Sequence, residues 1–289
     1  MPTAEHTASA GGSSPGIAVF VFGKRGYYAA AEHLAMTLAR YSPSHRVTLF
    51  AANTEAVDNN LFAEVHPLPL EVFQDGPGTM KTRIYDTLPD GEWLVMDADM
   101  LVKADLTPYI ANLRKHDFVM EVAGKGTTEA DLKYSPWATI ETQREVAGLH
   151  EDTIHYGVQS SWMWIRKPSK VAAQVFAKAK SYPYKREHLK EKWGNDIPDE
   201  LRFATALAEL QLDLPDISLS FYGAGYSNKG LSGVDQPVLC LYGDTRKHAL
   251  VRPGWMATYD RFLRNVYKDA GRTLTYPIHN VMRDKYVNQ

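Results

Sequence analysis

Residues 17–50, IAVFVFGKRGYYAAAEHLAMTLARYSPSHRVTLF, decide the fold class. The first six residues of this stretch form an unbroken apolar run that ends at Gly23, which is typical of a strand buried on both faces. Apolar side chains then recur at helical spacing over residues 31–41, and Ser42 marks the end of that helix. Residues 46–50 (RVTLF) have the composition of a second strand. The order strand, helix, strand predicts a parallel α/β sheet with a right-handed crossover.

The rest of the chain predicts further strands and helices, without an internal repeat or an obvious linker. Strands are predicted near residues 63–68, 92–96, 117–122, 155–165 (a strand pair or one bent strand) and 238–242. Helices are predicted at residues 80–87, after a cap at Ser169, from Pro198 onward, and at residues 258–268 with a C-terminal cap at Gly271. Residues 125–149 are polar and predict a loop that contains a helix. This order indicates one α/β domain with a mostly parallel central sheet and a decorated C-terminal half.

The composition excludes several classes of protein. The chain has 289 residues and a formal net charge of −2, which excludes a globally basic nucleic-acid binder. Its single cysteine, Cys240, excludes an internal disulfide and a cysteine-based zinc site. No apolar run is long enough to span a membrane, and residues 1–16 lack the charged and apolar parts of a secretory signal. We therefore expect a cytoplasmic protein with a flexible leader at residues 1–16 and one domain at residues 17–289.

Two carboxylates stand at the end of the predicted strand 92–96. Asp97 and Asp99, separated by Ala98, directly follow the apolar stretch EWLVM. Ligands of open α/β sheets bind beyond the carboxyl ends of the strands. Two like charges this close repel each other unless a cation lies between them, and Mg²⁺ or Mn²⁺ prefers carboxylate and phosphate oxygens. An isolated Asp-x-Asp is also common in turns and helix caps, but the buried strand before this one favours a metal site.

The segment Lys81–Val102, KTRIYDTLPDGEWLVMDADMLV, resembles the metal-binding core of GT-A fold glycosyltransferases. It is most similar to the group of glycogenin and the bacterial lipopolysaccharide galactosyltransferases, in which a basic residue precedes the first Asp of a DADxLV-type motif by sixteen positions. Lys81 stands sixteen positions before Asp97. The resemblance implies a single GT-A (Rossmann-like) domain, with a nucleotide-binding half at about residues 17–102 and a closing half at about residues 103–289. It also implies a UDP-sugar donor, Mn²⁺ or Mg²⁺, and transfer with retention of anomeric configuration.

The same resemblance implies further donor-binding and catalytic residues. Tyr27 and Tyr28 fall where the family has an aromatic side chain on the uracil base. The stretch HYGV at residues 155–158 resembles the family's N-x-G-V strand, and Asp199-Glu200 resembles its Asp-Gln pair. Residues 241–248, LYGDTRKH, resemble the late loop that closes on the pyrophosphate. The implied donor-binding set is Phe22, Gly23, Tyr27, Tyr28, Lys81, Asp97, Ala98, Asp99, His155, Gly157, Gly243 and Lys247, and the implied catalytic pair is Asp199 and Glu200.

Three positions depart from the family pattern. Tyr242 stands where the family has a histidine as third metal ligand, so either the two carboxylates and the donor phosphates hold the metal, or Tyr242, His248 or His279 supplies a further ligand. Glu200 replaces the family's Gln, which permits a nucleophile or a carboxylate that stabilises an oxocarbenium-like transition state. An acid in a first helical turn also has a purely structural explanation in the helix macrodipole. His155 replaces Asn and leaves the identity of the sugar open.

The acceptor is not determined by these motifs. Residues 245–289 contain nine Lys or Arg side chains and three Asp, with aromatic residues between them. Such a stretch suits a nucleic-acid base as acceptor, or an anionic membrane that presents a lipid-linked sugar, or it is only the solvated face of a helix. A saccharide acceptor is the main hypothesis. The alternatives are a glycosyltransferase acting on a modified base in DNA, a nucleotide-sugar binding module without turnover and, less favoured, a nucleotidyltransferase.

Overall fold

The computed structural model describes residues 15–69, 71, 77–132, 137–190, 197–222, 235–240, 253–278 and 280–281. The predicted leader therefore lies outside the described residues except for its last two positions, where Gly16 already begins a strand. Within the described part of the chain, no helix combines the length and apolar composition needed to cross a bilayer.

The predicted strand–helix–strand opening is confirmed. It consists of β1 (Gly16–Val21), α1 (Arg25–Tyr41) and β2 (Val47–Ala51), and β1 pairs in parallel with β2. The other strands are β3 (Glu64–Pro67), β4 (Gly91–Met96), β5 (Met100–Val102), β6 (Phe118–Gly126), β7 (His155–Lys167), β8 (Ser220–Tyr222) and β9 (Val238–Cys240). The other helices are α2 (Pro77–Met80), α3 (Ile84–Thr87), α4 (Thr107–Leu113), α5 (Ile140–Ala147), α6 (Lys170–Ser181), α7 (Asp199–Leu210) and α10 (Pro253–Asp269).

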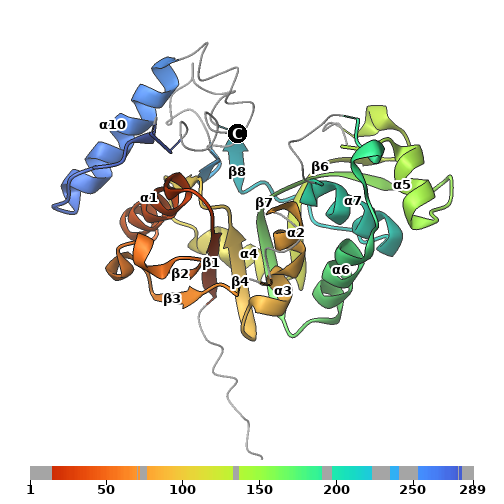
Figure 1. Ribbon diagram of the computed structural model, residues 1–289, viewed down its shortest axis with the longest axis horizontal. Coiled ribbons are helices and arrows are strands. Elements are labelled where there is room, and N and C mark those ends of the chain that lie inside the picture. Colours follow the sequence, from red (N-terminus) through yellow and green to blue (C-terminus); the bar gives the residue numbers. More distant parts are fainter. Residues whose placement is uncertain are drawn as a thin grey trace, which may run out of the picture.

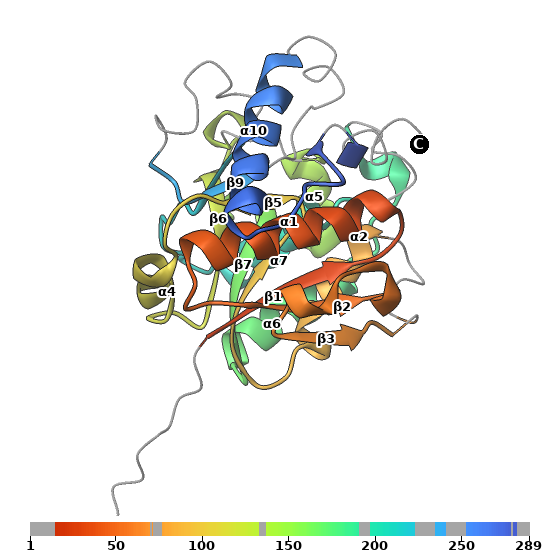
Figure 2. The same ribbon diagram turned by 90° about the vertical axis from the view of Figure 1, so that its left-hand side faces the viewer.

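The central sheet is mostly parallel. Among the described residues it has six strands in the order β3-β2-β1-β4-β7-β6, of which β3, β2, β1 and β4 run parallel. Strand β7 runs antiparallel to both of its neighbours, β4 and β6. Helix α1 covers one face of the sheet, and α6 with α7 covers the other (Figures 1 and 2). Alternate residues of β1 point to opposite faces of the sheet. Ile17 and Val19 belong to the hydrophobic cluster that includes α1, whereas Ala18 and Phe20 belong to the hydrophobic cluster that includes α6 and α7.

A small second sheet and helix α10 extend the α1 side. Strand β9 lies between β5, to which it is antiparallel, and β8, to which it is parallel. Helix α10 packs on α1, where the rings of Tyr41 and Phe262 stack with centroids 5.6 Å apart. The predicted cap at Gly271 is confirmed, because its φ is +68° and its N–H donates to the carbonyl of Lys268 at 3.0 Å. Helix α10 therefore ends in the left-handed conformation that favours glycine.

Two predicted elements differ in the structure. The helix predicted over residues 80–87 is divided into α2, a 3₁₀ turn η4 (Lys81–Arg83) and α3. The stretch predicted as a strand pair or a bent strand is the single long strand β7, which pairs along both edges. Because β7 supplies a continuous partner, β6 continues to Gly126 through residues that carry no apolar pattern, and part of the predicted loop 125–149 is strand.

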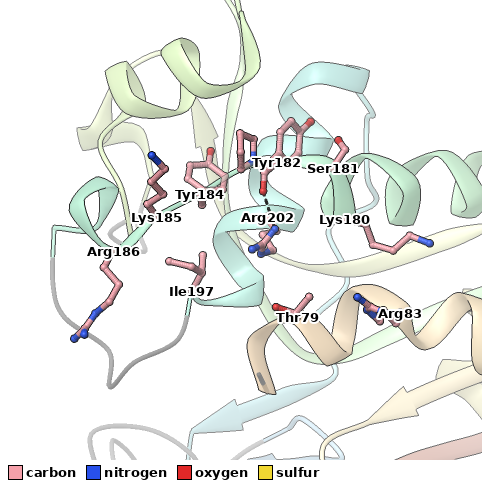
Figure 3. A pocket seen from close by; sticks show the side chains of 11 residues that line it. Thr79, Arg83, Lys180, Ser181, Tyr182, Tyr184, Lys185, Arg186, Ile197 and Arg202 are labelled. Atoms are coloured by element: carbon pink, nitrogen blue, oxygen red, sulfur yellow. Dashed lines mark hydrogen bonds between the residues drawn. The ribbon is translucent and has the colours of Figure 1, made fainter. Parts of the chain in front are cut away.

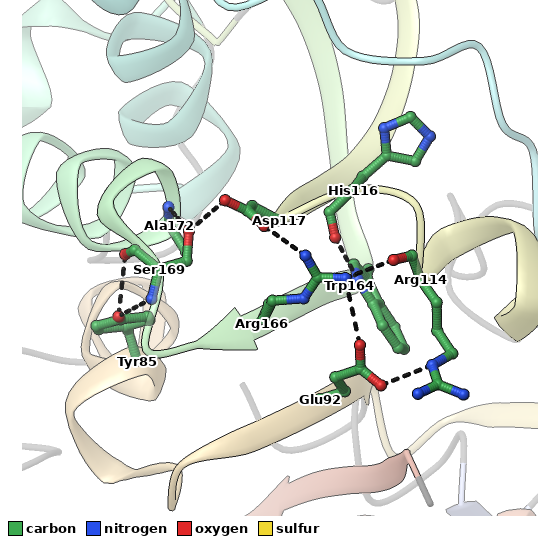
Figure 4. Close-up of polar contacts among 9 residues, drawn as sticks. All are labelled: Tyr85, Glu92, Arg114, His116, Asp117, Trp164, Arg166, Ser169 and Ala172. Atoms are coloured by element: carbon green, nitrogen blue, oxygen red, sulfur yellow. Dashed lines mark hydrogen bonds and ion pairs between the residues drawn. The ribbon is translucent and has the colours of Figure 1, made fainter. Parts of the chain in front are cut away.

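A polar network connects the start of β4, the residues just before β6 and the end of β7 (Figure 4). The guanidinium of Arg166 pairs with Asp117 at 2.7 Å and with Glu92 at 3.3 Å, and Glu92 also pairs with Arg114 at 2.7 Å. Asp117 in turn accepts a hydrogen bond at 3.1 Å from the hydroxyl of Ser169, which is the predicted N-cap of α6. The network fixes the start of α6 to the sheet at the end opposite to the site described next.

Candidate active site

The Asp97–Ala98–Asp99 turn lies at the carboxyl edge of the central sheet. It joins β4, which lies between β1 and β7, to β5 of the small sheet. The backbone N–H of Asp97 donates to the carbonyl of Ser161 on β7 at 2.8 Å, which fixes the turn to the neighbouring strand. Ala98 and Asp99 are both buried. The predicted motif is therefore held by backbone pairing at the edge where ligands of α/β sheets bind.

Lys81 joins this turn to two other elements. Its ammonium pairs with Asp97 at 2.9 Å, and it donates to the carbonyl and the hydroxyl of Ser160 at 3.1 and 3.0 Å. The carboxylate of Asp199 lies 3.6 Å from the same ammonium. Lys81 begins η4, which packs against α6 and α7. The sixteen-residue offset between Lys81 and Asp97 thus corresponds to direct contact in the structure.

Two more carboxylates come from the first turn of α7. Asp199 is buried, and its Oδ2, the atom 3.6 Å from the ammonium of Lys81, has no hydrogen-bond partner among the described residues. Glu200 accepts a hydrogen bond at 3.1 Å from the hydroxyl of Ser160, which itself accepts from Lys81. The N-terminus of a helix favours negative charge, which offsets part of the cost of burying both acids. Ser160 therefore links Lys81 to Glu200, whereas Asp199 lies directly beside Lys81.

The site carries more negative charge than its lysine balances. Burial raises the pKa of Asp97 to about 6, against the attraction of Lys81, and repulsion by Asp99 adds to the rise. Burial, with repulsion by Asp199, raises the pKa of Glu200 to about 8. Burial alone would lower the pKa of Lys81, but attraction by Asp199 and Asp97 raises it above its ordinary value. A further cation at this position would relieve the excess.

A metal ion fits Asp97 and Asp99 only as a pair of ligands. Within the described residues no group of three or more His, Cys, Asp or Glu side chains is arranged to hold a metal ion. Two carboxylates on one turn suit a hard divalent cation that takes its other ligands from phosphate oxygens and water. The positions considered for a third ligand, Tyr242, His248 and His279, lie outside the described residues, as do Gly243 and Lys247.

Four more of the predicted donor-binding residues, Phe22, Gly23, Tyr27 and Tyr28, lie one strand away. Phe22 and Gly23 follow the end of β1, which pairs with β4 so that Val19 is opposite Met96. Gly23 has a φ of +83°, which lets the chain turn sharply from the strand into α1. In the first turn of α1, Tyr27 is half-buried, whereas Tyr28 is 4% exposed and belongs to the core. Of the two tyrosines, Tyr27 is the one that a ligand can reach.

The structure does not bring His155 and Gly157 to this cluster. They pair with Gly126 and Gly124 on β6, and His155 lies five residues before Ser160, or about 17 Å along an extended strand. His155 is fully buried near Gln143, and burial lowers its pKa to about 4. It is a neutral packing residue in this structure.

The residues of β7 that reach the site are Ser160 and Ser161, which the sequence analysis missed. A signal for them exists in the sequence. If the N-x-G-V likeness is moved by four residues, it falls on Gln159-Ser160-Ser161-Trp162, which keeps a side-chain amide at the Asn position. Gln159 is 7% exposed and its side-chain carbonyl has no hydrogen-bond partner among the described residues. In the sequence alone, the N-x-G-V pattern aligns on His155 because a glycine, Gly157, stands two positions after it.

No protein-family model and no curated protein matches this sequence. The chain is similar to the solved structure of the galactosyltransferase LgtC in complex with donor and acceptor sugar analogs, with a TM-score of 0.54 and 11% identity over 91% of this chain and 98% of that chain. Other matches are mouse xyloside xylosyltransferase 1 (TM-score 0.47, 12% identity, 80% and 98% covered) and the glycosyltransferase GlyE of Streptococcus pneumoniae TIGR4 (0.46, 11%, 90% and 65%). We base the fold assignment on the first alone. The chain has the GT-A fold of that galactosyltransferase, and Asp97 and Asp99 lie at the carboxyl edge of its central sheet.

Proposed function

We propose that this protein is a metal-dependent glycosyltransferase that takes a sugar from a nucleotide-sugar, with UDP-sugar as the donor. The observation that carries the proposal is the Asp97–Asp99 turn, held at the end of β4 in a GT-A fold with Lys81 against it. The solved structure that shares this fold, with a TM-score of 0.54, is named as a galactosyltransferase. The proposal includes transfer with retention of anomeric configuration, which rests on the likeness of Lys81–Val102. It also includes a cytoplasmic location, which rests on the single cysteine.

Each residue of the cluster has a role in this proposal. Asp97 and Asp99 would hold Mn²⁺ or Mg²⁺, which neutralises the charge that develops on the leaving pyrophosphate. Lys81 holds Asp97 in position through their 2.9 Å ion pair. The Oδ2 atom of Asp199 is an acceptor for a hydroxyl of the donor sugar. Glu200, held by Ser160, would stabilise positive charge on the sugar or attack it directly.

A donor screen tests the proposal. We expect UDP-sugars to raise the midpoint of thermal unfolding in the presence of Mn²⁺ and to raise it little in the presence of EDTA, because the pyrophosphate binds through the metal. GDP- and CDP-sugars at equal concentration are the matched controls for the base, and UDP alone separates the contribution of the sugar. Equal shifts with and without Mn²⁺, or no shift with any nucleotide-sugar, would contradict the proposal.

Glu200→Gln separates the two possible roles of Glu200. If the carboxylate attacks the sugar, the amide cannot replace it, and turnover should fall about 1,000-fold or more with little change in donor binding. If Glu200 only stabilises charge, we expect about a 100-fold loss. We expect the smaller loss, because burial and repulsion by Asp199 raise the pKa of Glu200 and so disfavour the carboxylate that would have to attack the sugar. The measurement is the rate of hydrolysis of the UDP-sugar or of transfer, together with donor affinity.

A further inference from the structure

The hydroxyl of Ser161 is a buried polar group without a partner. Ser161 lies on β7 and is 6% exposed, and its Oγ has no hydrogen-bond partner among the described residues. A buried hydroxyl that makes no hydrogen bond costs free energy of folding, and a ligand or an ion that completes it is one explanation for its presence. Its neighbour Ser160 already binds Lys81 and Glu200, so the unpartnered hydroxyl lies in a segment that carries contacts of the candidate active site.

The pairing of β4 with β7 places this hydroxyl beside Asp97. The two strands are antiparallel, and the last pair of their ladder is Met96 opposite Trp162. Asp97 and Ser161 come next in the same register, and the N–H of Asp97 donates to the carbonyl of Ser161 at 2.8 Å. Residues directly opposite each other in an antiparallel pair project from the same face of the sheet, with Cβ atoms about 4.5–5.5 Å apart. The Ser161 hydroxyl and the Asp97 carboxylate are therefore neighbours.

The packing of both strands supports the shared face. Met163, two residues after Ser161, belongs to the hydrophobic cluster that includes α6 and α7, and alternate residues of a strand share a face. Asp97 pairs with Lys81 at 2.9 Å, and Lys81 begins η4, which packs against the same two helices. Both side chains therefore point to the side of the sheet that α6 and α7 cover.

The backbone at Ser161 is held on both sides. Its carbonyl accepts from Asp97, and the indole of the next residue, Trp162, donates to the carboxylate of Glu121 at 2.8 Å. Glu121 also accepts a hydrogen bond at 3.0 Å from the hydroxyl of Ser220 on β8. A ligand on a fixed backbone binds with little loss of conformational entropy, so the position of Ser161 suits a binding role.

A cavity of about 580 Å³ does not supply the partner of this hydroxyl (Figure 3). Its described lining includes Thr79, Tyr182 and Arg202, and it contains neither Ser161 nor Asp97. Arg202 donates to the carbonyl of Tyr182 at 2.8 Å within that lining (Figure 3). A molecule in the cavity contacts those residues, whereas the Ser161 hydroxyl belongs to the Asp97–Ala98–Asp99 turn.

We propose that the Ser161 hydroxyl is a ligand of the metal ion held by Asp97 and Asp99. This inference rests on the metal-dependent function proposed above and gives the ion a third protein oxygen. Hard divalent cations bind hydroxyl oxygens as well as carboxylates, as the Ser or Thr of P-loops binds Mg²⁺. A hydroxyl is neutral, so it adds a ligand without adding to the repulsion among the carboxylates of the site.

Ser161→Ala tests the hydroxyl by Mn²⁺ binding in the presence of UDP, measured from the electron paramagnetic resonance signal of the free ion. We expect the variant to bind Mn²⁺ about tenfold more weakly than the wild type, because even residues that only support metal ligands change metal affinity by about 10-fold to 100-fold. Ser44→Ala, at an exposed position, is the matched control and should bind like the wild type. Equal thermal unfolding midpoints show that both variants are folded.

Ser161→Cys separates a direct ligand from an effect on packing. A thiolate prefers soft ions, so we expect this variant to bind Cd²⁺ with UDP about tenfold more tightly than the wild type. It should also show the ultraviolet absorption of a cadmium–thiolate bond. Ser44→Cys is the control for an added thiol, and the buried Cys240 is present in every variant, so neither accounts for this band.

The inference is overturned if Ser161→Ala binds Mn²⁺ like the wild type or if Ser161→Cys gives no cadmium–thiolate band. It is also overturned if Ser161→Ala weakens binding of UDP-sugar equally in Mn²⁺ and in EDTA, because the hydroxyl then contacts the donor and not the ion. Asp99→Asn separates the two proposals. If it binds Mn²⁺ like the wild type, the proposed function fails and this inference with it; if it loses Mn²⁺ while Ser161→Ala does not, this inference alone fails.

Discussion

Asp99→Asn and Asp97→Asn should each weaken Mn²⁺-dependent binding of a UDP-sugar about 100-fold or more, which corresponds to about 2.7 kcal/mol. An amide oxygen is a poorer ligand for a hard divalent cation than a carboxylate, and each residue supplies one of the two carboxylates of the site. Calorimetric titration with UDP-sugar in excess Mn²⁺ measures the effect. Asp152→Asn, a change of the same chemistry at an exposed position, is the control and should bind like the wild type.

The fold should survive both substitutions. Asp97 is half-buried, and desolvation raises its pKa to about 6 against the attraction of Lys81, so its charged form is less stable in the fold than in the unfolded chain and a neutral amide removes that cost. We expect the thermal unfolding midpoint of Asp97→Asn to stay the same or to rise. If either variant binds UDP-sugar normally in Mn²⁺ while it remains folded, the metal site lies elsewhere.

Lys81→Met should have the largest effect on stability. The ammonium is the group that balances Asp97, Asp199 and Glu200, and its side chain is only 17% exposed. Its removal leaves buried carboxylates without a cation, which costs about 3 kcal/mol in the free energy of unfolding near neutral pH. Lys81→Arg keeps the charge and should cost less. Lys115→Met, at an exposed position, is the matched control and should change stability little.

The loss should depend on pH in a defined direction. Without Lys81 the folded-state pKa values of Asp97 and Glu200 rise further above the values of the unfolded chain. The folded state then binds more protons than the unfolded state between those values, so the stability of Lys81→Met falls as pH rises. Urea unfolding at about pH 5 and about pH 8 should show the larger gap from wild type at pH 8. A gap of equal size at both pH values would mean that the lysine acts through packing alone.

The fold was predictable because its strands are buried on both faces. A parallel strand covered by helices on each side is apolar throughout, and β1, β2 and β4 all have this composition in the sequence. Lys81 was placed in the donor site only through the family resemblance, by its offset of sixteen residues from Asp97. In the structure the chain runs from the helical turn that begins at Lys81 back through β4, and the two side chains are in contact.

The register of β7 was not predictable in the same way. His155 and Ser160 lie on one long strand, and which of them reaches Asp97 depends on pairing with β4 and on the irregular pairing with β6. Such pairing is set by residues far away in the sequence.

Electron paramagnetic resonance of Mn²⁺ tests the central claim most directly, because the signal of the free ion falls when the ion binds. We predict that Mn²⁺ alone binds weakly, since Lys81 already pairs with Asp97. Addition of UDP should remove about one equivalent of free ion per wild-type chain beyond what UDP removes in buffer, and none in Asp99→Asn. Equal loss of free Mn²⁺ in the wild type and in Asp99→Asn would contradict a nucleotide-sugar metal site at the end of β4.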